Sequence, residues 1–206
     1  MGEAILIYGK SGTGKSASLR EFGEEEIFLV QAIKKRLPFQ KKFKYTYISR
    51  DVGSIINGLK KMPVKTAVID DAGYILTGAF MDGHSKPKKG ASSFDLYNDI
   101  ADNFWKLINA IKDLPDDIVV YLIMHEESND YGDIKLRTIG KLLNDKVCIE
   151  GMCTVVLRCI VEGTEHVFYT QSTGNDISKS PEGMFEMKIP NDLKAVDTRI
   201  REYWSL

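Results

Sequence analysis

The sequence predicts an α/β fold in which a mostly parallel sheet is flanked by helices. Short apolar runs suited to buried strands recur through the first two thirds of the chain, at residues 4–8, 27–32, 66–69 and 118–124. Between these runs, residues 51–61 and 94–113 carry apolar side chains three and four positions apart, which is the spacing of an amphipathic helix. Strands that alternate with helices predict a parallel sheet with right-handed crossovers and helices on both faces.

The last third of the chain has a different pattern. Residues 152–161 form a long run suited to a strand, and residues 166–171 form a second run after a short polar turn. Two such runs joined by a turn predict a β-hairpin. A final helix is expected to begin at residues 190–192, with Asn191 as its cap, because apolar residues at helical spacing follow.

We expect residues 1–206 to form a single domain, because this length can bury one sizeable α/β core. Two segments, 78–93 and 126–145, hold scattered glycine, proline and charge, and we expect them to be mobile loops. The net charge of −1 gives no global basic field, so any contact with nucleic acid must come from local patches. No apolar run approaches the roughly 20 residues of a membrane span, so we expect no membrane association.

A complete phosphate-binding loop, G-x-x-x-x-G-K-[ST], occupies residues 9–16. It follows the run at 4–8, and residues 17–22 can continue it as a helix, which is the context that the motif requires. Glycine lets backbone N–H groups converge on an anion, and the start of a helix adds partial positive charge. The predicted nucleotide-binding residues are Gly9, Lys10, Ser11, Gly12, Thr13, Gly14, Lys15, Ser16 and Ala17. Lys15 is expected to reach the β- and γ-phosphates, and the Ser16 hydroxyl to ligate Mg²⁺.

Catalytic groups are expected at the ends of two other strands. The run at 66–69 ends in Asp70 and Asp71, which resembles the acidic strand end, called Walker B, of phosphate-loop proteins. Asp70 is the candidate Mg²⁺ ligand, and Asp71 the candidate that orients or deprotonates the attacking water. His125 follows the run at 118–124, where a polar side chain can contact the terminal phosphate and report its loss.

The transferred phosphoryl group also needs positive charge from outside the loop. Four basic residues are candidates for this role, and one of them could act on the nucleotide of a neighbouring subunit: Arg137, Lys141, Arg158 and Lys179. Lys179 is favoured because it follows the hairpin in a Gly-Asn-Asp loop.

The chain resembles the short RecA-like ATPases of bacteriophages, which are phage nucleotide-binding or AAA-domain proteins associated with single-strand annealing recombination. The resemblance rests on the phosphate loop, the Asp-Asp strand end, the strand ending in His, the hairpin and the segments 28–32, 35–39, 178–185 and 191–193. It implies ATP and Mg²⁺ as cofactors, a RecA-like core, and self-assembly into a ring or filament on single-stranded DNA. It also implies an annealing or recombination protein as partner, and the cytoplasm of a phage-infected or prophage-carrying bacterial cell as location.

The chain departs from RecA-type recombinases in two ways. They carry a catalytic Glu on the strand after the first helix, where this chain offers Gln31 and no carboxylate. Either Asp71 substitutes for that Glu, or hydrolysis is slow. The chain is also too short for their additional DNA-binding domain, which leaves the two loops as expected DNA contacts. Basic residues lie near aromatic ones in both loops: Lys86, Lys88 and Lys89 near Phe80 and Phe94, and Lys135 and Arg137 near Tyr131.

Three other functions remain open to different degrees. A small-molecule phosphotransferase is disfavoured because no arginine-rich lid is present. A GTPase is disfavoured because the guanine-reading Asn/Thr-Lys-x-Asp motif is absent. A non-catalytic module that uses ATP to control assembly cannot be separated from an ATPase by the sequence, because the usual catalytic Glu is missing.

Overall fold

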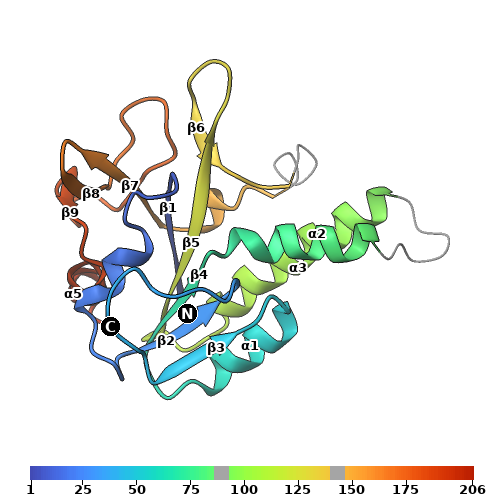
Figure 1. The fold of residues 1–206 in the computed structure, drawn as a ribbon. Coiled ribbons are helices and arrows are strands. Elements are labelled where there is room, and N and C mark those ends of the chain that lie inside the picture. The colour runs from blue at the N-terminus through green and yellow to red at the C-terminus, as the bar shows by residue number, and fades with distance from the viewer. Residues whose placement is uncertain (86–92, 140–146) are drawn as a thin grey trace.

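The computed structural model describes residues 1–85, 93–139 and 147–206 (Figure 1). The strands are β1 (Glu3–Gly9), β2 (Ile27–Gln31), β3 (Tyr45–Ile48), β4 (Thr66–Asp70), β5 (Val119–Ser128), β6 (Ile134–Leu136), β7 (Val155–Glu162), β8 (Glu165–Tyr169) and β9 (Lys188–Pro190). The helices are α1 (Val52–Lys61), α2 (Gly73–Ser85), α3 (Ser93–Lys112) and α5 (Leu193–Trp204), with short 3₁₀ helices η1 (Ser16–Glu21) and η2 (Glu150–Met152).

The described strands form one mixed sheet in the order β3-β2-β4-β5-β1-β7-β8-β9, with β6 paired to the projecting end of β5. All pairs from β3 across to β7 are parallel, whereas β8 is antiparallel to both of its neighbours, β7 and β9. The predicted α/β fold with a mostly parallel sheet, a C-terminal hairpin and a final helix is therefore confirmed. Strand β5 lies between β1 and β4, so the ends of these three strands meet at one edge of the sheet.

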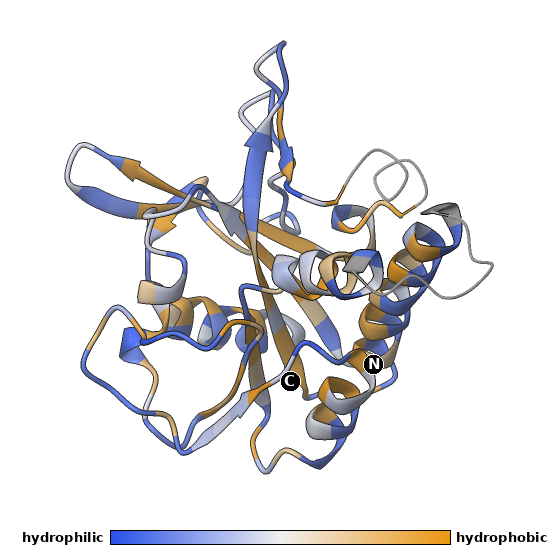
Figure 2. Ribbon diagram, turned by 45° about the vertical axis from the view of Figure 1, so that its right-hand side comes forward, coloured by the Kyte–Doolittle hydropathy of each residue, from blue (hydrophilic) through white to orange (hydrophobic). Residues whose placement is uncertain are grey.

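Each face of the sheet is covered by its own layer. Helices α1, α2 and α3 cover one face, and η1, α5 and the segment after β2 cover the other (Figure 1). The central strands are apolar on both faces, as expected where helices cover both sides, and Figure 2 shows them as the hydrophobic interior. On α3, the residues that face the sheet are fully or almost fully buried: Ile100, Phe104, Leu107, Ile108 and Ile111. Within the described parts of the chain, no helix is long and apolar enough to cross a membrane.

The expected loop at 78–93 is partly wrong. Residues 78–85 complete helix α2, and α3 begins at Ser93. Gly83 has a packing role in this helix, because a Cβ at this position would lie 2.3 Å from Leu96 Cδ1. Glycine therefore allows α2 and α3 to approach closely, rather than marking a loop. Lys86, Lys88 and Lys89 lie outside the described residues.

The expected loop at 126–145 is also partly wrong. Strand β5 continues to Ser128 and turns back antiparallel as β6, so Glu126 pairs with Leu136. The resulting hairpin projects from the sheet, and its exposed end of β5 is hydrophilic (Figures 1 and 2). Residues 140–146, including Lys141, lie outside the described residues.

Smaller differences concern the ends of elements. The segment after the phosphate loop is a six-residue 3₁₀ helix rather than an α-helix. Asp192 caps α5 by accepting hydrogen bonds from the backbone N–H groups of Lys194 and Ala195, so Asn191 is not the cap. Asn191 instead donates to Cys159 Sγ and accepts from Arg20. Strands β3, β6 and β9 were not predicted, because each is a short strand of three or four residues.

Candidate nucleotide-binding site

The phosphate loop leaves the sheet at the end of β1, and its glycines have separate physical reasons. Gly12 and Gly14 have φ angles of 82° and 96°, a left-handed conformation that side chains rarely adopt. A Cβ on Gly9 would lie 2.3 Å from the carbonyl oxygen of Cys159 on β7. The first glycine therefore allows two strands to pack, and the other two shape the loop.

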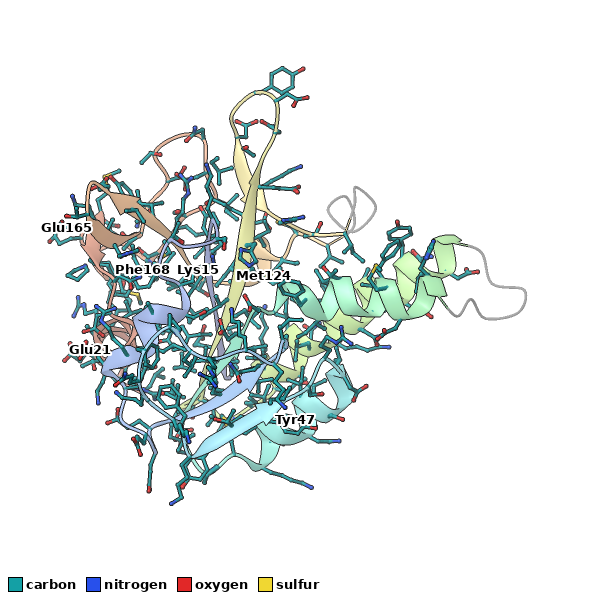
Figure 3. The ribbon with its side chains drawn as sticks, in the orientation of Figure 1. Lys15, Glu21, Tyr47, Met124, Glu165 and Phe168 are labelled. Carbon is teal, nitrogen blue, oxygen red and sulfur yellow. The ribbon has the colours of Figure 1, made fainter. Side chains whose placement is uncertain are left out.

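The back of the loop is bonded to the C-terminal hairpin. The carbonyl oxygen of Thr13 accepts hydrogen bonds from Cys159 Sγ at 2.9 Å and from His166 Nδ1 at 2.8 Å. Because a carbonyl oxygen only accepts, His166 carries a hydrogen on Nδ1. Figure 3 shows Lys15 between β5, marked by Met124, and the hairpin, marked by Phe168. The phosphate loop is thus held between its two neighbouring strands.

Lys15 is buried and directed back onto its own loop. Its Nζ donates to the carbonyl oxygens of Gly9 at 2.8 Å and Lys10 at 2.6 Å. Burial lowers the pKa of Lys15, while Cys159, Asp71 and Asp70 act in the opposite direction. Phosphate oxygens are stronger acceptors for an ammonium group than peptide carbonyls. Lys15 is therefore in place to exchange these carbonyls for phosphate oxygens.

Ser16 and Asp70 are joined across the sheet edge. Ser16 Oγ donates a hydrogen bond of 2.8 Å to Asp70 Oδ1 at the end of β4. Asp70 Oδ2 is buried and accepts no hydrogen bond within the described parts of the chain. Burial raises the pKa of Asp70 more than nearby Lys35 lowers it.

These two oxygen donors fit Mg²⁺. The ion prefers oxygen ligands, and it commonly binds through one or two protein groups together with phosphate and water. A buried carboxylate oxygen that accepts no hydrogen bond is the kind of ligand that a cation would satisfy. No cluster of three or more His, Cys, Asp or Glu side chains in the described residues could hold a metal alone. A magnesium ion here would therefore depend on the nucleotide for its remaining ligands.

Asp71 lies beside Asp70 in an unusual backbone conformation, with φ of 57°. Its Oδ2 contacts the ammonium group of Lys35, and its Oδ1 lies 3.6 Å from His125 Nε2. Burial raises the pKa of Asp71, but His125 and Lys35 outweigh it, so the pKa is lower than usual and the carboxylate is charged.

His125 is placed by the sheet itself, because it pairs with Gly9 in the register of β5 with β1. Its Nδ1 lies 3.5 Å from Lys15 Nζ, and its Nε2 faces Asp71. Because an ammonium group only donates, the contact with Lys15 favours a hydrogen on Nε2, directed toward Asp71. The structure thus brings Lys15, Ser16, Asp70, Asp71 and His125 together.

The cavity at this site has a volume of about 390 Å³. It is lined by Ser11, Gly12, Gly14, Lys15, Ser16, Ala17, Lys35, Arg36, Pro38, Asp71, His125 and His166. Lys35, Arg36 and His166 were missed by the sequence reasoning. No local pattern marks the first two, because their place depends on the pairing of β2 with β4, which sets Gln31 opposite Asp70. No carboxylate ends β2, and Gln31 Nε2 donates to the carbonyl oxygen of Lys35 at 3.1 Å.

Among the described residues, the candidates for a trans-acting cation do not line this cavity. Arg158 is wrong as a free cation, because its guanidinium forms two hydrogen bonds to Glu126, of 2.9 and 3.0 Å. Arg137 is exposed beyond the end of β6. Lys179 pairs through its backbone with Val156, so it extends the sheet beside β7. A role for Arg137 or Lys179 at a neighbouring subunit stays a prediction, as does one for Lys141.

A mostly parallel α/β sheet with a glycine-rich phosphate loop, a buried Lys and a Ser–Asp pair defines a P-loop NTPase. The comparison with protein families agrees: a family model described as an AAA domain matches residues 1–181. The chain therefore belongs to the AAA domain family, whose members are nucleotide-binding proteins of the ATPase type. A search of curated proteins found no match.

Proposed function

We propose that this protein is a Mg²⁺-dependent ATPase that acts with single-stranded DNA. The observation that carries the ATPase assignment is the convergence of Lys15, Ser16, Asp71 and His125 on one cavity, with Asp70 joined to Ser16 by a hydrogen bond. This set supplies a phosphate clamp, ligands for a divalent cation and a carboxylate near the terminal phosphate.

Each residue has a definite part in hydrolysis. Backbone N–H groups of the loop and Lys15 bind the phosphates, while Ser16 and Asp70 hold Mg²⁺, which when bound neutralises phosphate charge. Water adds to the terminal phosphorus as the bond to the bridging oxygen breaks, which releases ADP and inorganic phosphate. Asp71 orients this water and accepts its hydrogen bond, and His125 holds Asp71 in place.

Support for a DNA contact comes from the basic segment, which we define as residues 36–44. It holds Arg36, Lys41, Lys42 and Lys44 and no acidic residue. Lys44 Nζ lies 3.0 Å from Glu25 Oε1, and Lys41 Nζ donates to the carbonyl oxygens of Arg20 and Phe22, so Arg36 and Lys42 contribute most of the charge available to a ligand. Such local charge can bind phosphodiesters even though the whole chain is nearly neutral. The hairpin of β5 and β6 gives less support than expected, because its turn carries two aspartates and Lys135 Nζ lies 3.7 Å from Glu127.

The rest of this proposal follows from the family resemblance. We propose a ring or filament of several copies, an annealing or recombination protein as partner, and a role in phage recombination or replication. A neighbouring copy would then contribute positive charge to the terminal phosphate, as phosphate-loop ATPases often require.

A second candidate is an assembly module that binds ATP and hydrolyses it little. It is favoured by one observation: both oxygens of Asp71 face cations or His125, and β2 ends in Gln31 instead of a carboxylate. A carboxylate engaged in this way has less capacity to activate water.

The deciding experiment measures ATP hydrolysis by the purified protein with and without single-stranded DNA. Lys15→Ala serves as the background, because loss of its ammonium removes the phosphate clamp. We expect turnover that depends on Mg²⁺ and rises with DNA. Turnover that ignores DNA would remove the DNA part of the proposal, and ATP binding without turnover would favour the assembly module. Equal turnover by Lys15→Ala would reject the site.

The basic segment is tested separately by Lys42→Gln and Lys44→Gln. If both lysines contact phosphates, the double variant should bind single-stranded DNA more weakly. The slope of log affinity against log salt should also fall by about 0.7 for each lost contact. Lys106→Gln, an exposed change on α3, is the matched control. Unchanged affinity and slope in the double variant would place DNA elsewhere.

A further inference from the structure

Lys35 lies at the nucleotide site although no sequence motif marks it. It follows β2, and β2 pairs in parallel with β4 so that Gln31 lies opposite Asp70. The residues after these two strands therefore meet at the same edge of the sheet. The ammonium group of Lys35 contacts Asp71 Oδ2 and lies 3.9 Å from Asp70 Oδ2.

The contact with Lys35 occupies the carboxylate that hydrolysis would use. Asp71 Oδ2 faces Lys35 and Asp71 Oδ1 faces His125 Nε2, so both oxygens have partners. An ammonium on a carboxylate forms a strong charge-assisted hydrogen bond. Water competes poorly for an oxygen held in this way. Without nucleotide, Asp71 is therefore not available to orient water.

Lys35 also lines the cavity with Lys15 and Arg36. Its side chain is 38% exposed, so it is partly free to move toward a ligand. The terminal phosphate of a nucleoside triphosphate carries more negative charge and more acceptor oxygens than one carboxylate. A phosphate that enters beside Asp70 and Asp71 would meet two carboxylates, and a nearby cation must offset their repulsion.

We propose that Lys35 binds the terminal phosphate of a bound nucleoside triphosphate, and that it leaves Asp71 to do so. The same movement frees Asp71 to orient water. Lys35 thus distinguishes triphosphate from diphosphate, whereas Lys15 at the phosphate loop serves both. This inference rests on the proposed ATPase function, which it deepens by assigning a cation from the same chain.

The first test compares affinities for a non-hydrolysable ATP analogue and for ADP, both with Mg²⁺, by isothermal titration calorimetry. Lys35→Met should weaken the ATP analogue about tenfold or more, the size expected for a lost bond to a charged group. ADP affinity should change by less than about twofold. Lys34→Met is the matched control, because Lys34 is the exposed neighbour of the same chemistry and does not line the cavity.

The outcomes separate this inference from the proposed function. If the unmodified protein binds neither nucleotide, the ATPase proposal and the role of Lys35 both fail. The unmodified protein could instead bind both nucleotides while Lys35→Met weakens binding of the ATP analogue and of ADP by the same factor, or of neither. In that case only the role of Lys35 is rejected. If the Lys35–Asp71 ion pair only stabilises the fold, Lys35→Met should bind both nucleotides with the same relative affinity as the unmodified protein and should have a lower melting temperature.

A second test needs no variant and so does not depend on whether Lys35→Met folds. Trypsin can cut after Lys34, Arg36, Lys41 and Lys42, which flank or follow Lys35. If Lys35 moves onto the terminal phosphate, the ATP analogue should slow cleavage in residues 34–42, and ADP should not. Equal protection by the two nucleotides, or protection by neither, would overturn the proposal.

Discussion

Ser16 Oγ donates a hydrogen bond of 2.8 Å to Asp70 Oδ1, which joins the phosphate loop to the end of β4. The two residues are 54 positions apart in sequence. Ser16 follows β1, Asp70 ends β4, and β5 lies between these two strands in the sheet. The oxygens expected to hold Mg²⁺ are therefore already in contact without the ion. Little rearrangement of the backbone is needed for binding, so the site is preorganised.

Asp70→Asn should remove the dependence of nucleotide binding on Mg²⁺. The substitution keeps the shape of the side chain but removes the charge that the ion requires. The rate of hydrolysis should therefore fall strongly, whereas the affinity for ATP without magnesium should change little. The measurement is ATP affinity across a magnesium titration, followed by turnover at saturating ATP. A magnesium dependence equal to that of the unmodified protein would show that Asp70 is not the ligand.

Asp71→Asn should reduce the rate of hydrolysis by about 100-fold or more while ATP still binds, because a carboxylate near the water is lost. Asparagine tolerates the left-handed backbone that Asp71 adopts, with φ of 57°, so the fold should be kept. Single-turnover kinetics give the rate, and circular dichroism checks the fold. Asp130→Asn, at the exposed tip of the hairpin, is the control. A rate within twofold of the unmodified protein would exclude Asp71 as the water-orienting group.

Arg158→Ala should lower the free energy of unfolding by about 3–5 kcal/mol, because it leaves Glu126 buried without its cation. The Glu126 side chain is only 2% exposed, and its two oxygens accept both hydrogen bonds from Arg158. Replacing the pair by Glu126→Leu and Arg158→Met should recover most of this loss.

The measurement for the Arg158 series is urea denaturation, with the exposed Arg137→Ala as control, expected within about 0.5 kcal/mol of the unmodified protein. If Arg158→Ala were as stable as this control, Arg158 would be free to act on a nucleotide, as the sequence suggested.

Asp51→Ala should lower the stability of the protein by about 1 kcal/mol at neutral pH, because Asp51 caps helix α1. Its Oδ2 accepts a hydrogen bond of 2.7 Å from the backbone N–H of Ser54. Hydrogen bonds from the Ser54 side chain and from this backbone N–H lower the pKa of Asp51. A lowered pKa in the folded state gives stability that is present above the unfolded value and is lost as pH falls. The difference between the two proteins should therefore shrink below about pH 4.

Thermal unfolding from pH 3 to pH 7 measures this effect, with the exposed Asp102→Ala on α3 as control. A stability difference for Asp51→Ala that stays constant over this range would show that the charge of the cap contributes nothing.

Much of the fold could be predicted because its signals are local. The runs at 4–8, 27–32, 66–69 and 118–124 each became a strand of the parallel part of the sheet. Hydrophobic runs of this length, with helical spacing between them, reflect burial on both faces. The phosphate loop is likewise a local pattern, and the rule that parallel strands end at a common edge placed Asp70 and His125 near it.

The parts that were missed depend on contacts between distant residues. Gly83 lies in a segment that the sequence predicts as a loop, and only its closeness to Leu96 shows that it permits two helices to pack. Lys35 looks like an ordinary surface lysine until β2 is known to pair with β4. The pairing of Arg158 with Glu126 also joins two strands that are far apart in sequence. Pairing order of strands is a property of the whole chain, which a local pattern does not contain.

The two hydrogen bonds that Thr13 accepts from Cys159 and His166 have a mechanical consequence. They fasten the phosphate loop to β7 and β8, so the loop cannot retract from the hairpin without breaking both bonds. A displacement of the hairpin would therefore move the phosphate loop directly. A displacement of α1 would have to be transmitted through most of the strands of the sheet. A protein that bound this hairpin could therefore change the rate of nucleotide release without contacting the nucleotide.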